Sequence, residues 1–237
     1  MTTTIPAPER GGGRARPPVP RAGKRERTRA ALLDAAIGVI AEHGTEFACI
    51  DETVQRAGMA RGTFYNYFET RDHLLRAVAQ RMVELVDERV ADHVDPRWNA
   101  ATRVACMVTG FIEMGLKDTR LGWAWSRFGG HLPSLLANDH RKPPAIETAV
   151  RELTGTPGRP DAAYTLMSGT AQMTLRRMLE GALGERDREA VIGMLLRGLG
   201  APARQIPAAL RIAREFAAGL ALVPGQGGAL PPERAGA

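Results

Sequence analysis

Helical spacing recurs along this sequence, whereas the alternation typical of strands is weak throughout. Apolar side chains repeat every three or four residues from about residue 24 to residue 221, and Gly or Pro lies at most of the breaks. The predicted helices cover residues 24–43, 50–57, 61–67, 71–93, 98–117, 120–137, 144–153, 161–181, 186–199 and 203–221. We therefore predict an all-α protein.

The two ends of the chain have a different composition. Residues 1–22 are rich in Pro, Gly and Arg, and such a segment cannot bury enough apolar surface to fold, so we predict a disordered arm. The chain has a net charge of +6, and this excess lies within residues 1–30. This charge suits an arm that binds phosphates, or equally a solvated tail. Residues 223–237 are again rich in Pro and Gly, and we expect a flexible tail.

Several protein classes find no support in the sequence. No apolar run is long enough for a membrane span, and the N-terminus lacks a signal-peptide core, so we expect a cytoplasmic protein. Cys49 and Cys106 are too few for a disulfide framework or a thiolate zinc site. The histidines have no metal-binding spacing, and neither a phosphate loop nor a GxSxG motif occurs. We predict no enzyme activity, no metal and no cofactor.

Three short helices in residues 24–67 form a compact pattern. The second and third are joined by "AGMA", residues 57–60, in which Gly58 can take the left-handed conformation. This spacing is typical of a helix-turn-helix unit, whose second helix enters the DNA major groove with its first residues toward the base edges. The sequence therefore predicts DNA binding through residues 61–67.

Residue types in "RGTFYNYF", residues 61–68, suit this task. Arg61 offers a planar fork of donors for phosphate or guanine, and Tyr65 and Tyr67 end in hydroxyls that can donate to phosphate oxygens. Gly62 costs about 1 kcal/mol of helix stability relative to Ala, and close approach of the backbone to DNA would compensate. Thr63 adds a hydroxyl and a methyl group. We interpret these residues as the DNA-facing side of the helix.

The remaining rings of this segment have a structural interpretation. Phe64 and Phe68 lie four residues apart, on one face of a helix, and we expect both to point inward and hold the recognition helix on helix one. Arg71 then opens the next helix within reach of the DNA backbone. A buried helical hairpin would need neither Arg61 nor Gly62, so we prefer the DNA-binding interpretation.

The stretch "TRAALLDAAIGVIAEHG…ETVQRAGMARGTFYNYFETRDHLL" resembles the DNA-binding domain of the TetR family of bacterial transcriptional regulators. The resemblance covers about residues 27–75. It implies DNA contacts at matching positions, including two near the start of helix one. These positions are Thr28, Arg29, Arg61, Gly62, Thr63, Tyr65, Asn66, Tyr67 and Arg71.

Three positions depart from the family pattern. A hydroxyl residue is usual where Ala48 precedes helix two and where Ala60 precedes helix three. Ala at an N-cap costs about 1 kcal/mol, so capping and a phosphate contact are in doubt at both sites. Thr53 is polar where an apolar residue is usual, so we expect looser packing of helix two.

The later helices carry broad apolar stripes rich in Met and Trp, which favour either a core or an adaptable ligand surface. The resemblance implies an effector cavity among the central helices. The predicted lining is Met107, Phe111, Met114, Trp123, Trp125, Phe128, Tyr164, Met167, Thr170 and Met173. Candidate polar anchors are Arg103, Glu113, Ser126, Arg127 and His131, and the sequence singles out none of them.

The helices 161–181 and 186–199 suggest an association surface. The second is apolar on most sides, and the first carries small residues at 168–171 that allow close packing. The resemblance implies a four-helix bundle with a second subunit. The homodimer would place two recognition helices roughly 34–36 Å apart, one DNA turn.

Together these features predict a sequence-specific transcriptional regulator that binds a palindromic double-stranded operator as a homodimer. We expect a repressor that a small, largely apolar effector releases from DNA. The predicted domains are an arm at 1–22, a helix-turn-helix domain at 23–70, an effector and dimerisation domain at 71–222, and a tail at 223–237. Two alternatives stay open: an architectural or nonspecific DNA-binding protein, and a regulator controlled by a protein partner.

Overall fold

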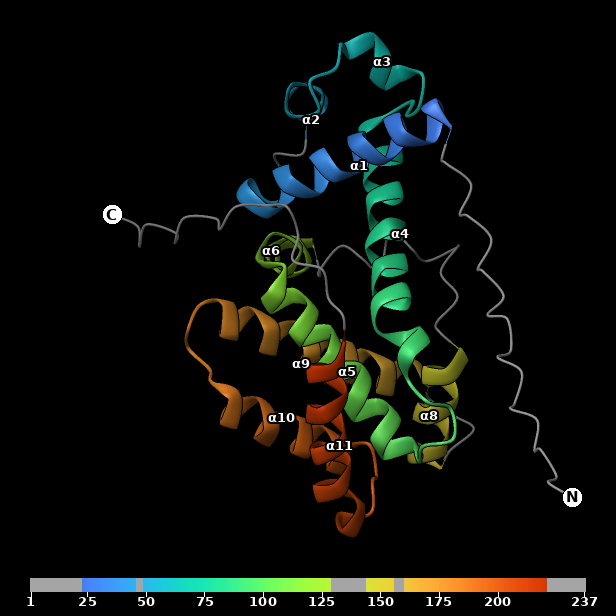
Figure 1. Cartoon of the computed structure of the whole chain (residues 1–237), viewed down its shortest axis with the longest axis vertical. Coiled ribbons are helices and arrows are strands. Elements are labelled where there is room, and N and C mark those ends of the chain that lie inside the picture. The colour runs from blue at the N-terminus through green and yellow to red at the C-terminus, as the bar shows by residue number, and fades with distance from the viewer. Residues whose placement is uncertain (1–22, 46–48, 129–143, 156–159, 221–237) are drawn as a thin grey trace, which may run out of the picture.

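The computed structural model describes residues 23–45, 49–128, 144–155 and 160–220. Within these ranges the regular elements are all helices, which confirms the predicted all-α class (Figure 1). The helices are α1 (Lys24–His43), α2 (Ile50–Arg56), α3 (Arg61–Tyr65), α4 (Arg71–Arg89), η2 (Ala91–His93), α5 (Ala100–Lys117), α6 (Thr119–Phe128), α8 (Pro144–Thr154), α9 (Pro160–Leu179), α10 (Glu185–Gly198), η3 (Ala203–Gln205) and α11 (Ile206–Gly219). The arm at 1–22, the tail at 223–237 and His131 lie outside the described residues.

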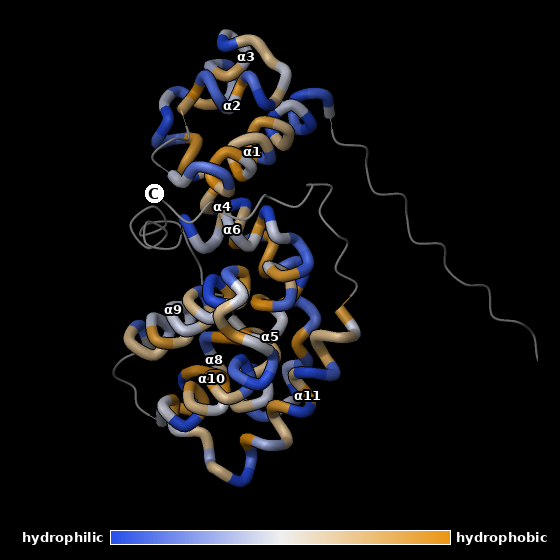
Figure 2. The backbone as a smooth tube through the Cα atoms, turned by 90° about the vertical axis from the view of Figure 1, so that its left-hand side faces the viewer, coloured by the Kyte–Doolittle hydropathy of each residue, from blue (hydrophilic) through white to orange (hydrophobic). Residues whose placement is uncertain are grey.

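Helices α1, α2 and α3 make up the N-terminal unit, which lies at one end of the molecule in both views (Figures 1 and 2). Two glycines with positive φ set its corners. Gly44, at φ 90°, ends α1, and Gly58, at φ 64°, makes the turn between α2 and α3. Both angles lie in the left-handed region that other residues rarely adopt, so the chain can reverse sharply at these points.

Helix α4 leads from the N-terminal unit into the rest of the molecule (Figure 1). It begins with a side-chain cap, because the Thr70 hydroxyl accepts from the backbone N–H of His73 at 3.1 Å. The predicted helix 71–93 was too long. At Val90 the backbone leaves the helical region, with φ −129° and ψ −60°, and a short 3₁₀ turn follows.

The rest of the chain, the C-terminal unit, is built around α5. Nearly every residue of this helix is buried, and α8, α9, α10 and α11 all contact it. Glycines allow close packing at its end: a Cβ added to Gly122 of α6 would lie 2.4 Å from the Gly115 carbonyl oxygen. The core therefore lies along α5, with the other helices arranged around it.

Helix α6 joins the two units, because two of its arginines bind α1. Arg120 donates to the Asp34 carboxylate at 2.7 Å, and Arg127 donates to the backbone carbonyl of Ala41 at 2.6 Å. The donors are seven residues apart on α6 and the acceptors are seven residues apart on α1. This pair of contacts, which we call the α6 clamp, fixes α1 against the C-terminal unit at two points.

Candidate nucleic-acid interface

Helix α3 and the turn after it bury their two phenylalanine rings and expose their polar side chains. Phe64 and Phe68 are completely buried with ring centroids 5.5 Å apart, which confirms the inward orientation predicted for them. Arg61 and Asn66 are exposed, and Tyr65 is 48% exposed. Phe64, together with Phe68 just after the helix, therefore anchors α3 in the core of the N-terminal unit and leaves a polar face uncovered.

The uncovered face is organised by a polar group at the start of α3. Arg61 forms an ion pair with Asp51 of α2 at 3.0 Å, between two well-exposed side chains. A hydrogen bond with Tyr65, followed by the charge of Asp51, raises the pKa of the Arg61 guanidinium above its usual value. An exposed pair of this kind contributes little to stability, so Arg61 can exchange Asp51 for another anion at small cost.

Gly62 lies on the same face, and nothing in the described fold requires a glycine there. A Cβ added at this position meets no atom within 4 Å, and its φ is not positive. Glycine in a helix is nevertheless unfavourable relative to Ala. The space beside its backbone is therefore open to an external molecule.

Basic side chains at the start of α1 lie beside this face. The Arg25 guanidinium lies 5.9 Å from the ring centroid of Tyr67, and the Arg29 guanidinium lies 5.7 Å from that of Phe68. The Thr28 hydroxyl is satisfied within its own helix, because it donates to the Lys24 carbonyl at 3.0 Å. The sequence reasoning missed Arg25, whose place beside Tyr67 appears only in the fold.

Four of the predicted contact residues are half-buried. Three of them are Thr28, Thr63 and Tyr67. Arg71 is also half-buried, and its guanidinium donates to the carbonyl of Thr45. Arg71 thus ties the start of α4 to the end of α1 and is the weakest of the predicted DNA contacts.

The N-cap residue is the predicted one for α3 but not for α2. Ala60 is the N-cap of α3 and offers no side-chain cap, as predicted. The N-cap of α2 is Cys49 rather than Ala48, which lies outside the described residues, and it too makes no side-chain cap. Thr53 is fully buried and its hydroxyl donates to the Cys49 carbonyl at 3.0 Å, so this polar position is satisfied inside the unit.

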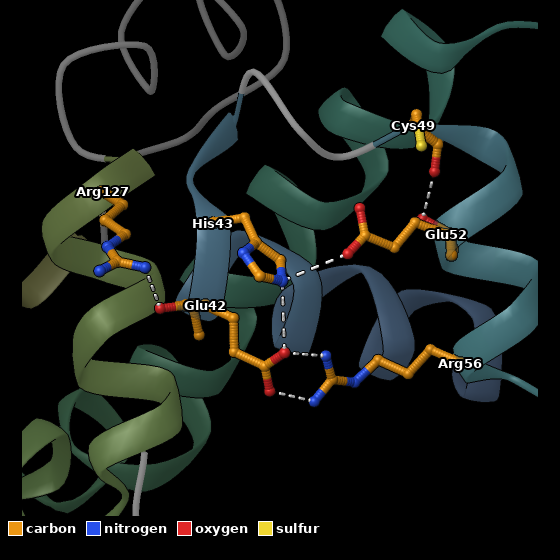
Figure 3. Close-up of polar contacts among 8 residues, drawn as sticks. Glu42, His43, Cys49, Glu52, Arg56 and Arg127 are labelled. Atoms are coloured by element: carbon orange, nitrogen blue, oxygen red, sulfur yellow. Dashed lines mark hydrogen bonds and ion pairs between the residues drawn. The ribbon is translucent and has the colours of Figure 1, made fainter. Parts of the chain in front are cut away.

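A charged network holds α2 on the end of α1 (Figure 3). Arg56 binds both carboxylate oxygens of Glu42, one of them at 2.7 Å. His43 lies 3.3 Å from the Glu52 carboxylate. The Arg56 guanidinium fits over Gly38 of α1, where an added Cβ would lie 2.7 Å from its Nε atom. The position of α2 therefore depends on a glycine in the middle of α1.

The predicted effector-site residues fall into three groups. Met107, Phe111, Met114, Trp125, Phe128 and Met167 are buried. The rings of Phe111 and Trp125 meet edge to face, with centroids 5.3 Å apart. Trp123, Tyr164 and Thr170 are half-buried, and the Arg127 guanidinium lies 5.4 Å from the Trp123 ring centroid.

Met173 does not belong with this set. Its side chain is 59% exposed, so its placement in an internal lining was wrong. Leu166 of the same helix and Met194 of α10 are exposed to 48% and 59%. On a folded chain, it is exposed apolar side chains gathered in one patch that mark surfaces for other molecules. Met173 is part of this outer apolar surface of α9 and α10.

Most of the candidate polar anchors already have partners. Arg103 pairs with Glu152, Glu113 pairs with Arg188 at 3.2 Å, and Arg127 belongs to the α6 clamp. Ser126 remains, because its buried hydroxyl has no hydrogen-bond partner among the described residues.

Two further buried polar atoms, Trp125 Nε1 and Asp87 Oδ1, lack hydrogen-bond partners within the described part of the chain. The sequence reasoning named Trp125 but missed Asp87. Burial, followed by the charges of Asp92, Glu84 and Glu88, raises the pKa of Asp87 to about 6. The charge of Asp87 also acts on Tyr164 of α9, whose pKa is raised mainly by burial. Asp87 is thus a half-buried polar site on α4 whose charge reaches Tyr164 of α9.

The described helices show neither a membrane span nor a metal centre. No helix in the described ranges is long and apolar enough to cross a membrane. Among the same residues, no three His, Cys, Asp or Glu side chains gather in a metal-binding group.

Residues 32–78 match the family model for bacterial regulatory proteins of the tetR family. Over 74 residues, the chain is 40% identical to the transcriptional repressor LfrR of Mycolicibacterium smegmatis, covering 31% of this chain and 38% of LfrR. It is 27% identical over 90 residues to the fatty acid metabolism regulator protein of Bacillus subtilis, covering 38% of this chain and 46% of that protein. The matched segments thus span less than half the length of these curated relatives.

Solved structures extend the likeness over most of the fold. RolR in complex with resorcinol superposes with a TM-score of 0.57 at 27% identity, covering 80% of this chain and 94% of RolR. FadR from Bacillus subtilis in complex with stearoyl-CoA superposes with a TM-score of 0.54 at 17% identity, covering 71% and 98%. The expectation of a regulator rather than an enzyme agrees with these matches. In residues 32–78 and in its fold, the chain is therefore similar to the TetR family of bacterial regulatory proteins.

Proposed function

We propose that this protein is a cytoplasmic, sequence-specific DNA-binding transcriptional regulator that acts as a homodimer. The observation that carries the proposal is the division of α3, whose Phe64 ring is buried while Arg61, Gly62 and Tyr65 face outward. A helix packed in this way presents donors and a bare backbone to a partner. These are the features that a recognition helix needs in the major groove.

The proposed DNA contacts have distinct roles. Arg61 leaves Asp51 for a base edge or a phosphate, and Tyr65 donates its hydroxyl to a phosphate oxygen. Gly62 lets the backbone approach the groove. The remaining members of the proposed interface are Thr28, Arg29, Thr63, Asn66, Tyr67 and Arg71, together with Arg25.

The proposed dimer forms through α9 and α10. Leu166, Met173 and Met194 offer exposed apolar area on these helices. Gly169 adds a position where a Cβ would meet no atom within 4 Å, so a second subunit can approach the backbone of α9 closely. Two such subunits related by a two-fold axis would match a palindromic operator.

The proposed effector is a small, largely apolar molecule that contacts the rings of α5 and α6. RolR bound to resorcinol and FadR bound to stearoyl-CoA support a ligand-controlled mode. The repressor LfrR supports release from DNA as the response. The effector lowers DNA affinity only to the extent that it binds the non-binding conformer more tightly.

Fluorescence anisotropy tests the proposal, with labelled DNA from the region upstream of the gene that encodes this protein. Arg61→Ala should weaken binding by about 5- to 150-fold, the range of about 1–3 kcal/mol for a good base contact. Arg97→Ala is the matched control, because this exposed arginine pairs with Asp95, beyond the other end of α4. Unchanged affinity of Arg61→Ala, in a protein that still elutes as a dimer, would refute the assignment of α3.

Scrambled DNA of the same length separates a specific regulator from a nonspecific DNA-binding protein. A regulator should prefer its operator at every salt concentration. Equal affinity for both DNAs, with a steep salt dependence, would instead indicate binding by charge alone.

A further inference from the structure

A pocket with a volume of about 350 Å³ opens where α1, α4 and α6 meet. Its size is at the lower end of the range for small-molecule sites. The apolar part of its wall is aliphatic and comes from all three helices. These residues are Ala30, Leu33, Ile37, Leu85 and Leu121. The pocket therefore lies at the junction of the N-terminal and C-terminal units, apart from the ring-rich region of α5 and α6.

Each of the three carboxylates in the pocket wall already has a donor. Glu26 accepts from the backbone N–H of Gly23 at 3.0 Å. Asp34 accepts from Arg120 at 2.7 Å. Asp118 accepts from the backbone N–H of Leu121 at 3.1 Å. Each of these carboxylates thus has at least one donor within the protein.

The arginines in the same wall keep unused donors. The nearest oxygen to Arg89 in its ion pair with Asp118 is 3.8 Å away, beyond hydrogen-bond distance. Arg29 faces the Phe68 ring and has no ion pair within the described residues. Arg81 and Arg120 are the exceptions, because Glu84 and Glu88 bind Arg81 and Asp34 binds Arg120. The guanidinium groups of Arg29 and Arg89 are therefore the donors that the pocket wall offers to an anionic acceptor.

We propose that this pocket binds a small amphipathic carboxylate. Its carboxylate pairs with Arg29 and Arg89, and its hydrocarbon part lies against Leu33, Leu85 and Leu121. Guanidinium groups suit a carboxylate because the planar fork can donate two parallel hydrogen bonds. This site is separate from the ring-lined effector site of the proposed function and adds a second ligand to the protein.

The position of Arg29 gives the ligand a regulatory effect. Arg29 is also a proposed DNA contact. A bound carboxylate that pairs with its guanidinium therefore competes with the operator DNA for this side chain. The occupied pocket also braces α1 against α4 and α6. This effect on DNA rests on the proposed function, whereas the binding of the ligand does not.

Isothermal titration calorimetry with three probes of equal chain length tests the site: octanoate, 1-octanol and octylamine. Octanoate should bind more tightly than either of the others, since only its head group carries the negative charge that pairs with the arginines. Ala30→Phe, which places a ring at the pocket wall, should weaken octanoate binding at least 10-fold. Ala31→Phe is the matched control, because Ala31 is exposed on α1 and does not line the pocket.

A second pair of variants keeps the test decisive if Ala30→Phe fails to fold. Arg29→Gln should weaken octanoate binding at least 10-fold, whereas Arg25→Gln, one turn earlier on α1, should not. Equal binding by all four variants would place octanoate elsewhere, for example among the rings of α5 and α6, and would overturn the proposal. Absence of octanoate binding to the unaltered protein would also overturn it.

The DNA effect is measured separately by anisotropy. Octanoate should lower the operator affinity of the unaltered protein, and Arg29→Gln should lose most of this response. A protein that binds octanoate in calorimetry but shows no operator binding would contradict the proposed function while leaving the pocket assignment standing.

Discussion

At the scale of single residues, Gly62 lowers the stability of the helix to which it belongs. The described fold leaves room for a Cβ there, and helix propensity favours one. Gly62→Ala should therefore raise the free energy of unfolding by up to about 1 kcal/mol, measured by thermal or urea denaturation. The same change should weaken operator binding in the anisotropy assay, since a methyl group then stands between backbone and DNA. A variant that is both more stable and equally tight in binding would remove the proposed reason for the glycine.

A second residue, Asp87, makes stability depend on pH. Its pKa is about 6 in the folded chain against an ordinary value of 3.8, so the folded state holds a proton that the unfolded state releases. Stability should therefore fall as pH rises from about 4 to about 6 and remain lowered above that range. Asp87→Asn should raise the melting temperature at pH 7.5, with the gain shrinking toward pH 4. Asp92→Asn should give a smaller gain, because it removes only one neighbouring charge and not the burial. An equal gain for Asp87→Asn at both pH values would show that the burial of its charge is not the cause.

At the scale of helices, the fit of α2 on α1 depends on Gly38 and Arg56. In the unaltered chain, Gly38→Ala drives a methyl group into the guanidinium and should destabilise the protein by displacing Arg56 from Glu42. With Arg56→Ala present, that collision is gone. The same Gly38→Ala change should then stabilise by about 1 kcal/mol through helix propensity.

The double-mutant cycle is measured by urea denaturation of the four proteins, and the expected signature is a change of sign. If Gly38→Ala has the same effect in both backgrounds, the packing of Arg56 over Gly38 does not position α2.

Much of this helix arrangement was predictable from sequence, because local signals define it. Helix α1 begins and ends where predicted, since Gly44 takes a conformation that other residues avoid. Helix α3 ends at Tyr65, two residues early, because Asn66 and Tyr67 form a turn that their residue types do not signal.

The contacts between distant segments were not predictable. The bond from Arg127 to Ala41 and the exposure of Met173 depend on how helices cross, and one sequence carries no signal for that. The DNA-facing residues could be proposed because they share one short motif. The effector-site residues come from several helices, so the sequence could suggest only their residue types.

At the scale of the whole molecule, the α6 clamp should control the spacing of the two N-terminal units in a dimer. The chain provides its own probe positions. Cys49 is exposed, whereas Cys106 is buried and burial raises the pKa of its thiol to about 12, so a thiol-specific spin label should attach to Cys49 alone. Double electron–electron resonance between the labels on the two Cys49 side chains of a dimer then measures the distance between its two N-terminal units.

Loss of the clamp should broaden the measured distance distribution. Arg120→Gln combined with Arg127→Gln removes both contacts, and Arg97→Gln provides a control away from α1. Exchanging the charges, with Asp34→Arg and Arg120→Asp together, should narrow the distribution again relative to either single reversal. A distribution that the double Gln variant leaves unchanged would show that α4 alone fixes the N-terminal unit.

The α6 clamp also determines which segment of this protein can be exchanged for that of a related regulator in a hybrid protein. Asp34 and Ala41, which α6 holds, lie on the same helix as Arg25 and Arg29, which face the proposed DNA. Helix α1 therefore both contacts α6 and contributes side chains to the proposed DNA interface. A hybrid that exchanges the whole N-terminal unit would bring in an α1 from another protein, whose side chains are matched to the α6 of that protein. A hybrid that exchanges only residues 49–68 would keep the native joint, and should change which DNA is bound while leaving the response to ligand intact.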